Sequence, residues 1–222
     1  MIQAKNIYKS FGKEKILKGI NIMVKEGSIV CILGESGAGK STLLHILGTL
    51  EKPTINKKIK PIIKINKEDI LSLTDKELSI LRNQKIGFIF QTPQLLPEFT
   101  VLENICLPGF INKKKVKKKA IDLLKELNIS KYENSKVEEL SGGQKQRVSV
   151  ARALINDPKI IFADEPSGNL DIKNAEKLHN FFDFLNFKFK QTFLIVTHNL
   201  QLANMADEKL KIENGTLYKI DK

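Results

Sequence analysis

The 222-residue sequence has no long hydrophobic run and only two cysteines, and both shortages exclude classes of protein. No apolar stretch approaches the roughly 18 residues needed to cross a bilayer. Strand-like sequence follows residues 1–5 directly, so we expect no signal peptide. Cys31 and Cys106 lack the spacing of a metal site, and we expect both to be reduced residues in or near the core.

Arginine is scarce although the net charge is +12. Of the 37 basic residues only Arg82, Arg147 and Arg152 are arginines, which leaves 34 lysines. Nucleic-acid surfaces use arginine for contacts to bases and aromatic rings for stacking, and the densest lysine run, 113–119, contains neither. We therefore expect no specific nucleic-acid partner. The run is predicted to be a solvated loop and helix start, with weak attraction to anionic lipid as the alternative.

The remaining sequence has the pattern of a large folded core. Hydrophobic residues make up 41% of the chain. Short apolar runs predict buried strands, and helical patterns lie between them. The predicted strands are 29–33, 86–90, 160–163 and 192–196, and the predicted helices are 42–47, 144–155 and 173–186. Strands that alternate with helices predict an α/β fold with a largely parallel sheet.

Other segments carry local signals of their own. Residues 1–30 alternate as strands around a turn at 12–15, residues 59–65 are strand-rich, and Asn214-Gly215 predicts a hairpin. The stretch 92–140 has helical spacing, including an amphipathic helix at 120–127. We expect it to be an inserted helical segment that is broken into pieces at Pro93, Pro97 and Pro108.

A phosphate-binding loop (the P-loop, 34–41) follows the strand at 29–33. Its sequence, Gly-Glu-Ser-Gly-Ala-Gly-Lys-Ser, fits G-x-x-x-x-G-K-[ST] at every fixed position and opens a helix. Its glycines let backbone N–H groups approach a phosphate, and the helix N-terminus favours negative charge there. Lys40 is predicted to reach the β- and γ-phosphates, and the Ser41 hydroxyl to bind Mg²⁺. An ordinary glycine-rich turn is the alternative.

A second glycine-capped helix begins about 100 residues later, at the signature segment (140–144). Ser141, Gly142, Gly143 and Gln144 offer a hydroxyl and unpaired backbone N–H groups at a helix N-terminus. Alone, such a segment is more often a helix cap than a ligand site. With a P-loop in the same chain it predicts a split site, in which one copy holds the nucleotide and a second copy covers the γ-phosphate. A two-fold dimer satisfies both sites at once.

Two acidic residues follow the apolar strand at 160–163. The carboxyl ends of parallel strands are where ligands bind in such folds. Asp164 is predicted to hold Mg²⁺ directly or through water, and Glu165 to accept the proton of an attacking water. A surface acidic pair is the alternative.

Two further polar residues follow buried strands in the same way. His198 comes after the strand at 192–196 and is predicted to contact the γ-phosphate and position water, although a lone histidine is usually structural. Gln91 ends the strand at 86–90 and is predicted to sense Mg²⁺ and the γ-phosphate.

Together these motifs resemble the nucleotide-binding subunits of ATP-binding cassette (ABC) transporters, over essentially the whole chain. The resemblance implies a P-loop ATPase core with an antiparallel β subdomain and an inserted α-helical subdomain. It implies a single nucleotide-binding domain, 1–222, in which 1–91 and 145–222 form the core and 92–144 form the helical subdomain with the signature segment.

The resemblance also implies an active ATPase with ATP and Mg²⁺ as its cofactors. Its partners would be a second copy of itself and integral membrane permease subunits, on the cytoplasmic side of the inner membrane. Phe11 stands where relatives place an aromatic ring that stacks on adenine. Tyr8 is a less favoured choice, and an ordinary core role for Phe11 is the alternative. Apolar residues of the loop 91–99 would dock the membrane subunit, with core packing as the alternative.

The expected site residues fall into four groups. The catalytic residues are Lys40, Gln91, Glu165 and His198. The ATP-binding residues are Phe11, Gly34, Glu35, Ser36, Gly37, Ala38, Gly39, Lys40, Ser41, Thr42, Ser141, Gly142, Gly143 and Gln144. The metal-binding residues are Ser41, Gln91 and Asp164, and those at the dimer interface are Ser141 and Asp171, the latter in the D-loop (168–171).

Within the ABC family, four segments resemble the ATP-binding subunits of lipoprotein-releasing (LolD-type) systems and their macrolide-efflux (MacB-type) relatives. These segments are 81–91, 95–104, 168–171 and 197–203. Asn199 replaces the aspartate common after the histidine, the region 109–119 is shorter than in many relatives, and Asn56 stands at a usual Ser-Gly turn. Macrolide or peptide efflux and cell division remain alternatives.

Two rivals lie outside transport. ATPases that act on DNA share the same motifs but insert long coiled coils, and no sustained heptads lie between Lys40 and Leu140. Translation-associated cassette proteins usually carry two cassettes on one chain.

Overall fold

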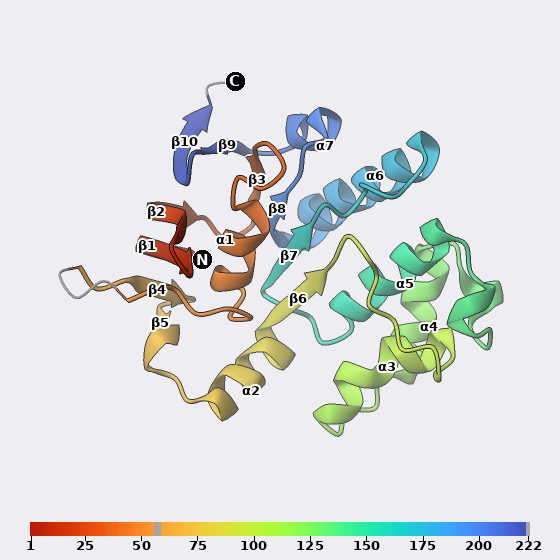
Figure 1. Cartoon of the computed structure of the whole chain (residues 1–222). Coiled ribbons are helices and arrows are strands. Elements are labelled where there is room, and N and C mark those ends of the chain that lie inside the picture. Colours follow the sequence, from red (N-terminus) through yellow and green to blue (C-terminus); the bar gives the residue numbers. More distant parts are fainter. Residues whose placement is uncertain (56–58, 221–222) are drawn as a thin grey trace.

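The protein is described by a computed structural model that covers residues 1–55 and 59–220 (Figure 1). A six-stranded sheet has the order β10-β9-β3-β8-β7-β6. Its strands are β3 (Ile29–Leu33), β6 (Ile86–Ile89), β7 (Ile160–Asp164), β8 (Thr192–Val196), β9 (Glu208–Glu213) and β10 (Thr216–Ile220). All neighbours in it pair in parallel except β9 and β10, which form the predicted hairpin at Asn214-Gly215.

A second sheet is antiparallel throughout and has the order β2-β1-β4-β5. Its strands are β1 (Ile2–Phe11), β2 (Glu14–Val24), β4 (Ile62–Ile65) and β5 (Glu68–Asp69). The strand expected at 59–65 is therefore shorter than predicted. The departure noted at Asn56 lies outside the described residues. Together, the two sheets confirm the predicted α/β class with an added antiparallel sheet.

Seven α-helices complete the described part of the chain. They are α1 (Lys40–Leu47), α2 (Asp75–Lys85), α3 (Val101–Ile111), α4 (Lys117–Glu126), α5 (Gly142–Leu154), α6 (Ile172–Phe189) and α7 (Leu200–Asn204). Short 3₁₀ turns lie at Ile70–Ser72, Ser130–Tyr132 and Val137–Glu139. In Figure 1, α3, α4 and α5 gather on one side of the six-stranded sheet, and α1 lies between the two sheets.

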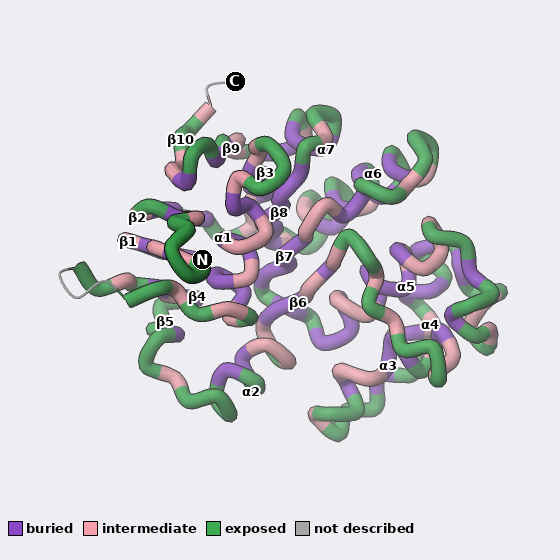
Figure 2. Tube along the Cα trace, viewed as in Figure 1, coloured by how far each residue is buried: buried purple, intermediate pink, exposed green. Residues whose placement is uncertain are grey.

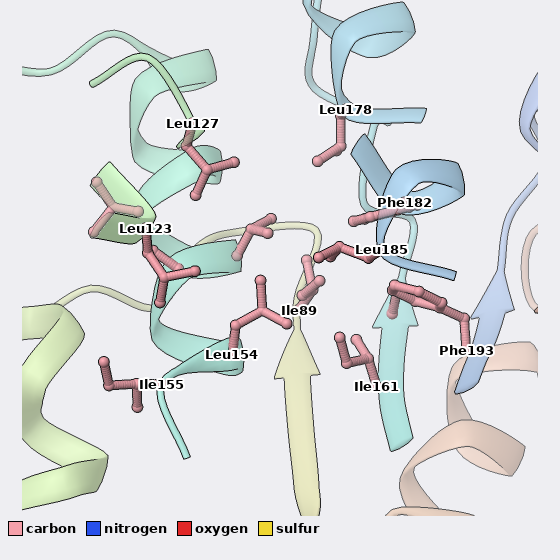
Figure 3. Packing of buried hydrophobic residues seen from close by; sticks show 14 of the residues in the cluster. Ile89, Leu123, Leu127, Leu154, Ile155, Ile161, Leu178, Phe182, Leu185 and Phe193 are labelled. Atoms are coloured by element: carbon pink, nitrogen blue, oxygen red, sulfur yellow. The ribbon is translucent and has the colours of Figure 1, made fainter. Parts of the chain in front are cut away.

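The central strands are buried on both faces, because successive side chains point to opposite sides of a sheet. On β7, Ile160 and Phe162 join a core formed with α1 and the antiparallel sheet. Ile161 and Ala163 join a second core formed with α3 to α6. Figure 3 shows this second core, in which Leu154, Leu185 and Phe193 surround Ile89 and Ile161. Burial on both faces accounts for the unbroken apolar runs seen in the sequence. Figure 2 shows the buried residues concentrated in the sheet and in the helices beside it.

Pro108 does not break the chain's helical pattern as predicted, because it lies inside α3, which continues to Ile111. Proline lacks the backbone N–H that an interior helical residue donates, so such a position needs support from elsewhere. Here the carbonyl of Pro108 accepts hydrogen bonds from the Asn83 and Asn156 side chains, both at 3.0 Å. These contacts with α2 and with the residues after α5 satisfy the Pro108 carbonyl near the C-terminal end of the helix.

Both cysteines are free and buried, as expected. Burial raises the pKa of the Cys31 thiol to about 12 and also raises the pKa of Cys106. Because the thiolate is the reactive form, we expect Cys31 in the folded chain to react with a disulfide reagent at pH 8 roughly a thousandfold more slowly than in 6 M guanidinium. Absorbance of the released thiolate measures the rate. A Ser72→Cys variant, which adds a thiol at an exposed position, is the control and should react at once. Fast labelling of both native cysteines in the wild-type chain would contradict the buried placement.

Candidate active site

The P-loop connects β3 to α1, and two of its glycines are required by close packing. A Cβ at Gly34 would lie 2.6 Å from the carbonyl oxygen of Ile212. A Cβ at Gly39 would lie 2.9 Å from side-chain atoms of Ile16 and Leu17, and Gly39 has a φ of 98°, which favours glycine. Gly39 is the N-cap of α1 and supplies no side-chain cap. Backbone N–H groups of the first turn therefore remain available to an anion.

Lys40 is held in the centre of this loop. The residue is buried, and its ammonium donates hydrogen bonds to the carbonyls of Gly34 at 2.9 Å and Glu35 at 3.0 Å. Its Nζ also lies 3.9 Å from the Glu165 carboxylate. These contacts anchor the cation where a phosphate in the loop would meet it.

The groups predicted to hold Mg²⁺ lie side by side. The Ser41 hydroxyl donates a hydrogen bond to Oδ1 of Asp164 at 2.9 Å. Burial raises the pKa of Asp164 above its ordinary value, and the Ser41 hydrogen bond and the nearby His45 and Lys40 partly offset this. Carboxylate and hydroxyl oxygens are hard ligands, and Mg²⁺ commonly completes its shell with phosphates and water. The pair therefore fits a magnesium ion bound next to a nucleotide.

Glu165 and His198 are brought together from the ends of β7 and β8. Oε1 of Glu165 lies 3.0 Å from Nδ1 of His198, and Oε2 accepts a hydrogen bond from the His198 backbone N–H at 3.2 Å. The backbone N–H of Glu165 donates to the carbonyl of Val196 at 2.9 Å. Glu165 also has a positive φ of 43°, which is uncommon outside glycine. Its carboxylate is thus fixed from several directions.

A cavity of about 580 Å³ joins most of the predicted ATP-binding and catalytic residues. That volume is within the range of small-molecule sites. The cavity is lined by Ile16 together with Phe11, Gly34, Glu35, Ser36, Gly37, Gly39, Lys40, Ser41, Thr42, Gln91, Glu165 and His198. Ala38 belongs to the same loop and donates its N–H to the carbonyl of Glu35. The alternative of an ordinary core role for Phe11 is wrong, because Phe11 is 52% exposed.

The signature segment does not line this cavity. Ser141 is the N-cap of α5 and forms a capping box with Gln144, whose Oε1 accepts the Ser141 N–H at 2.7 Å. Ser141 and Gly142 are exposed, and a Cβ added at Gly142 would meet nothing within 4 Å. Asp171, also exposed, caps α6 by accepting the N–H of Asn174. Within the described part of one chain, these residues therefore stand apart from the P-loop.

The structure adds residues that the sequence did not single out. Nε2 of His45 is buried without a hydrogen-bond partner among the described residues and lies 3.7 Å from Oδ2 of Asp164. His45 is four residues after Ser41 on α1, a spacing that places both on one helix face and could have revealed it. The Arg147 guanidinium of α5 donates to Oδ1 of Asn174 at 2.5 Å, and Nδ2 of Asn174 donates to Asp171 at 2.5 Å. No spacing in the sequence indicates the contact between Arg147 and Asn174.

Fold and cavity together define a P-loop ATPase of the cassette type. The chain belongs to the ABC transporter family, whose match covers residues 17–168. Among known proteins it is 50% identical over 220 residues to the "Lipoprotein-releasing system ATP-binding protein LolD" of Cytophaga hutchinsonii, with 98% of each chain covered. It is 46% identical to the protein of the same description from Bacteroides fragilis, covering 98% of this chain and all of the relative.

Solved structures agree with this assignment. The dimeric structure of MJ0796, described as a bacterial ABC transporter cassette, superposes with a TM-score of 0.90 at 38% identity and full coverage of both chains. A post-hydrolysis dimer of the same cassette bound to ADP and Pi gives 0.89. In the part of the chain that the structure describes, no helix has the length and apolar character needed to cross a membrane.

Proposed function

We propose that this chain is the ATP-hydrolysing subunit of a transporter that releases lipoproteins from the inner membrane toward the outer membrane. The observation that carries the ATPase activity is the carboxylate of Glu165, held 3.0 Å from His198 at the wall of the P-loop cavity. The cargo rests on the 50% identity to a lipoprotein-releasing relative. The alternative functions are macrolide or peptide efflux and a role in cell division.

The proposed mechanism assigns one task to each group. P-loop N–H groups and Lys40 bind the β- and γ-phosphates, and Phe11 stacks on adenine. Ser41, Asp164 and Gln91 would hold Mg²⁺, which would neutralise charge on the phosphates. Glu165 takes the proton of a water whose oxygen bonds to the γ-phosphorus as the bond to ADP breaks, and His198 orients that water. Such chemistry depends on positioning and charge more than on covalent help.

The position of the signature segment supports a split site shared by two copies of the chain. Ser141 and Gly142 are exposed and lie away from the P-loop of their own chain. In the proposed dimer each copy places Ser141, Gly142, Gly143 and Gln144 against the γ-phosphate bound by the other copy. Asp171 lies at the seam. The similar cassette MJ0796 has been solved as a dimer.

A membrane partner is proposed for the helical part of the chain. Leu96 of the loop 91–99 is 43% exposed, and Phe110 and Ile111 at the end of α3 are also exposed. Exposed apolar groups of this kind are typical of docking surfaces. We propose that residues 92–144 act as the helical subdomain that receives the permease, and that 1–91 and 145–222 form the core. The chain would then sit on the cytoplasmic face of the inner membrane.

Co-purification with the membrane partner tests the proposal. The full chain, tagged, is expressed in its native host and extracted in mild detergent, and copurifying membrane proteins are identified. ATP turnover of the complex is then measured in vesicles with purified lipoprotein, with a macrolide, or with duplex DNA. Stimulation by lipoprotein alone is expected. Stimulation by the macrolide would favour efflux, and stimulation by DNA without any membrane partner would overturn the transport role.

A further inference from the structure

The loop that begins with the catalytic carboxylate is short. We call residues 165–171 the connecting loop, because it joins β7 to α6. The Gly168 N–H donates to the carbonyl of Glu165 at 3.0 Å, and the Leu170 N–H donates to that of Ser167 at 3.1 Å. These turns shape the loop internally. They do not by themselves fix it to the body of the protein.

Ser167 is the last buried residue of the connecting loop before its exposed part begins at Gly168. Gly168, Asn169 and Asp171 are exposed, whereas Ser167 is only 5% exposed. A buried hydroxyl is costly unless it has a hydrogen-bond partner. The partner here is the imidazole of His179, with Nε2 at 3.0 Å from the Ser167 Oγ.

His179 belongs to the rigid part of α6. It is 3% exposed and lies about two turns from the start of the helix. Its neighbours in sequence, Leu178 and Phe182, are members of the core beneath the six-stranded sheet. Burial lowers the pKa of His179, and Glu176 offsets this only in part. The ring is therefore neutral at neutral pH, with one nitrogen able to donate and the other able to accept a hydrogen bond.

The His179–Ser167 contact ties the connecting loop to α6 two residues after Glu165. At its far end the loop is also tied to α6 through Asp171, which accepts hydrogen bonds from Asn174. The contacts of Glu165 and Asn169 lead instead to segments that line the cavity. Glu165 contacts His198 and Val196, and Asn169 donates to the carbonyl of Gln91 at 3.2 Å. His179 lines neither the cavity nor any exposed surface. His179 therefore contacts the connecting loop from the protein interior and does not contact ATP.

We propose that His179 is a positioning residue for ATP hydrolysis, which holds Ser167 and thereby sets the placement of the Glu165 carboxylate. This inference rests on the proposed ATPase function. It predicts an effect on turnover without an effect on ATP binding, because the P-loop residues that bind phosphate do not depend on His179.

Steady-state ATPase assays of the full chain test this role with matched variants. His179→Phe keeps a ring and removes both ring nitrogens, and Ser167→Ala removes the same hydrogen bond from the loop side with little change in volume. Each is expected to lower kcat about 3- to 10-fold, the range for one neutral hydrogen bond, with KM for ATP within twofold of wild type. His179→Gln can place an amide nitrogen near the position of Nε2 and is expected to restore at least half of the wild-type kcat.

The double variant separates positioning from general destabilisation. Since both single changes remove one shared contact, Ser167→Ala combined with His179→Phe should be no slower than the slower single variant. Leu178→Ala, which weakens the same helix from the core, is the control and should lower Tm without the loss of kcat. If His179→Phe fails to fold, Ser167→Ala and His179→Gln still decide the question.

Three outcomes would overturn the role of His179. They are an unchanged kcat in Ser167→Ala, a loss in His179→Phe that Gln does not restore, and multiplicative losses in the double variant. Wild-type protein and Glu165→Gln are assayed in parallel. An inactive wild-type chain would refute the proposed ATPase function. An active wild-type chain whose kcat is unchanged by the His179 substitutions would refute only the positioning role.

Discussion

Substituting Glu165 by Gln is expected to lower ATP turnover of the full chain roughly 10²- to 10⁴-fold, the range for loss of a general base. Gln has nearly the shape of Glu and can still accept the His198 backbone N–H, which lies 3.2 Å from Oε2. It cannot take a proton from water at neutral pH. ATP affinity should stay within a few-fold of wild type, because the P-loop and Lys40 are untouched. Phosphate release and binding of a fluorescent ATP analogue measure the two quantities.

The Glu165→Gln variant also tests whether two copies of the chain share the split site. With hydrolysis blocked, Glu165→Gln should accumulate as a dimer in Mg-ATP and stay monomeric without nucleotide, as seen by light scattering after gel filtration. Glu138→Gln removes one carboxylate from an exposed position and is the control, with wild-type turnover expected. Normal turnover in Glu165→Gln would remove the base assignment. A strictly monomeric Glu165→Gln chain at saturating Mg-ATP would remove the shared site.

Gly142→Asp is expected to lower turnover by about 10³-fold or more while the fold stays intact. Groups supplied across an interface are worth roughly 10³–10⁵ in rate in phosphoryl transfer, and a carboxylate here would face the γ-phosphate of the other copy. The structure has open space for a side chain at Gly142, since no atom lies within 4 Å of an added Cβ. Aspartate also suits the first turn of a helix. Thermal unfolding should therefore be unchanged or slightly raised.

Nucleotide binding to the isolated Gly142→Asp chain should match wild type, because the signature segment lies outside the P-loop cavity of its own chain. Asn128→Asp adds the same charge at an exposed position with a left-handed φ of 55° and serves as the control. Equal turnover in Gly142→Asp and wild type would mean that the signature segment is no more than a helix cap.

The sequence was most informative where local chemistry decides the structure. The apolar runs predicted β3, β7 and β8 because strands buried on both faces consist mostly of apolar residues. The glycines of the P-loop marked a turn where Gly34 and Gly39 have no room for a side chain. Because parallel strands end at one edge, the polar residues after β7 and β8 were expected to meet, and Glu165 and His198 do so.

Tertiary contacts account for what the sequence could not show. Pro108 was expected to break a helix, but it lies inside α3, where its carbonyl accepts hydrogen bonds from the Asn83 and Asn156 side chains of other segments. His179 resembles any core histidine in sequence, and only the fold places it against Ser167. The spacing of His45 and Ser41 places both on one helix face, but the distance from His45 to Asp164 depends on how α1 packs against β7. Such contacts join residues far apart in the chain and leave no periodic pattern.

Asn174 has a consequence for communication within the molecule. One side of its amide receives the Arg147 guanidinium from α5, and the other side donates to Asp171 at the start of α6. Through this side chain, α5, which begins with the signature segment, is joined to the connecting loop that begins with Glu165. In the proposed dimer, a shift of either element would therefore be passed to the other, and we expect the two nucleotide sites to be coupled through this contact.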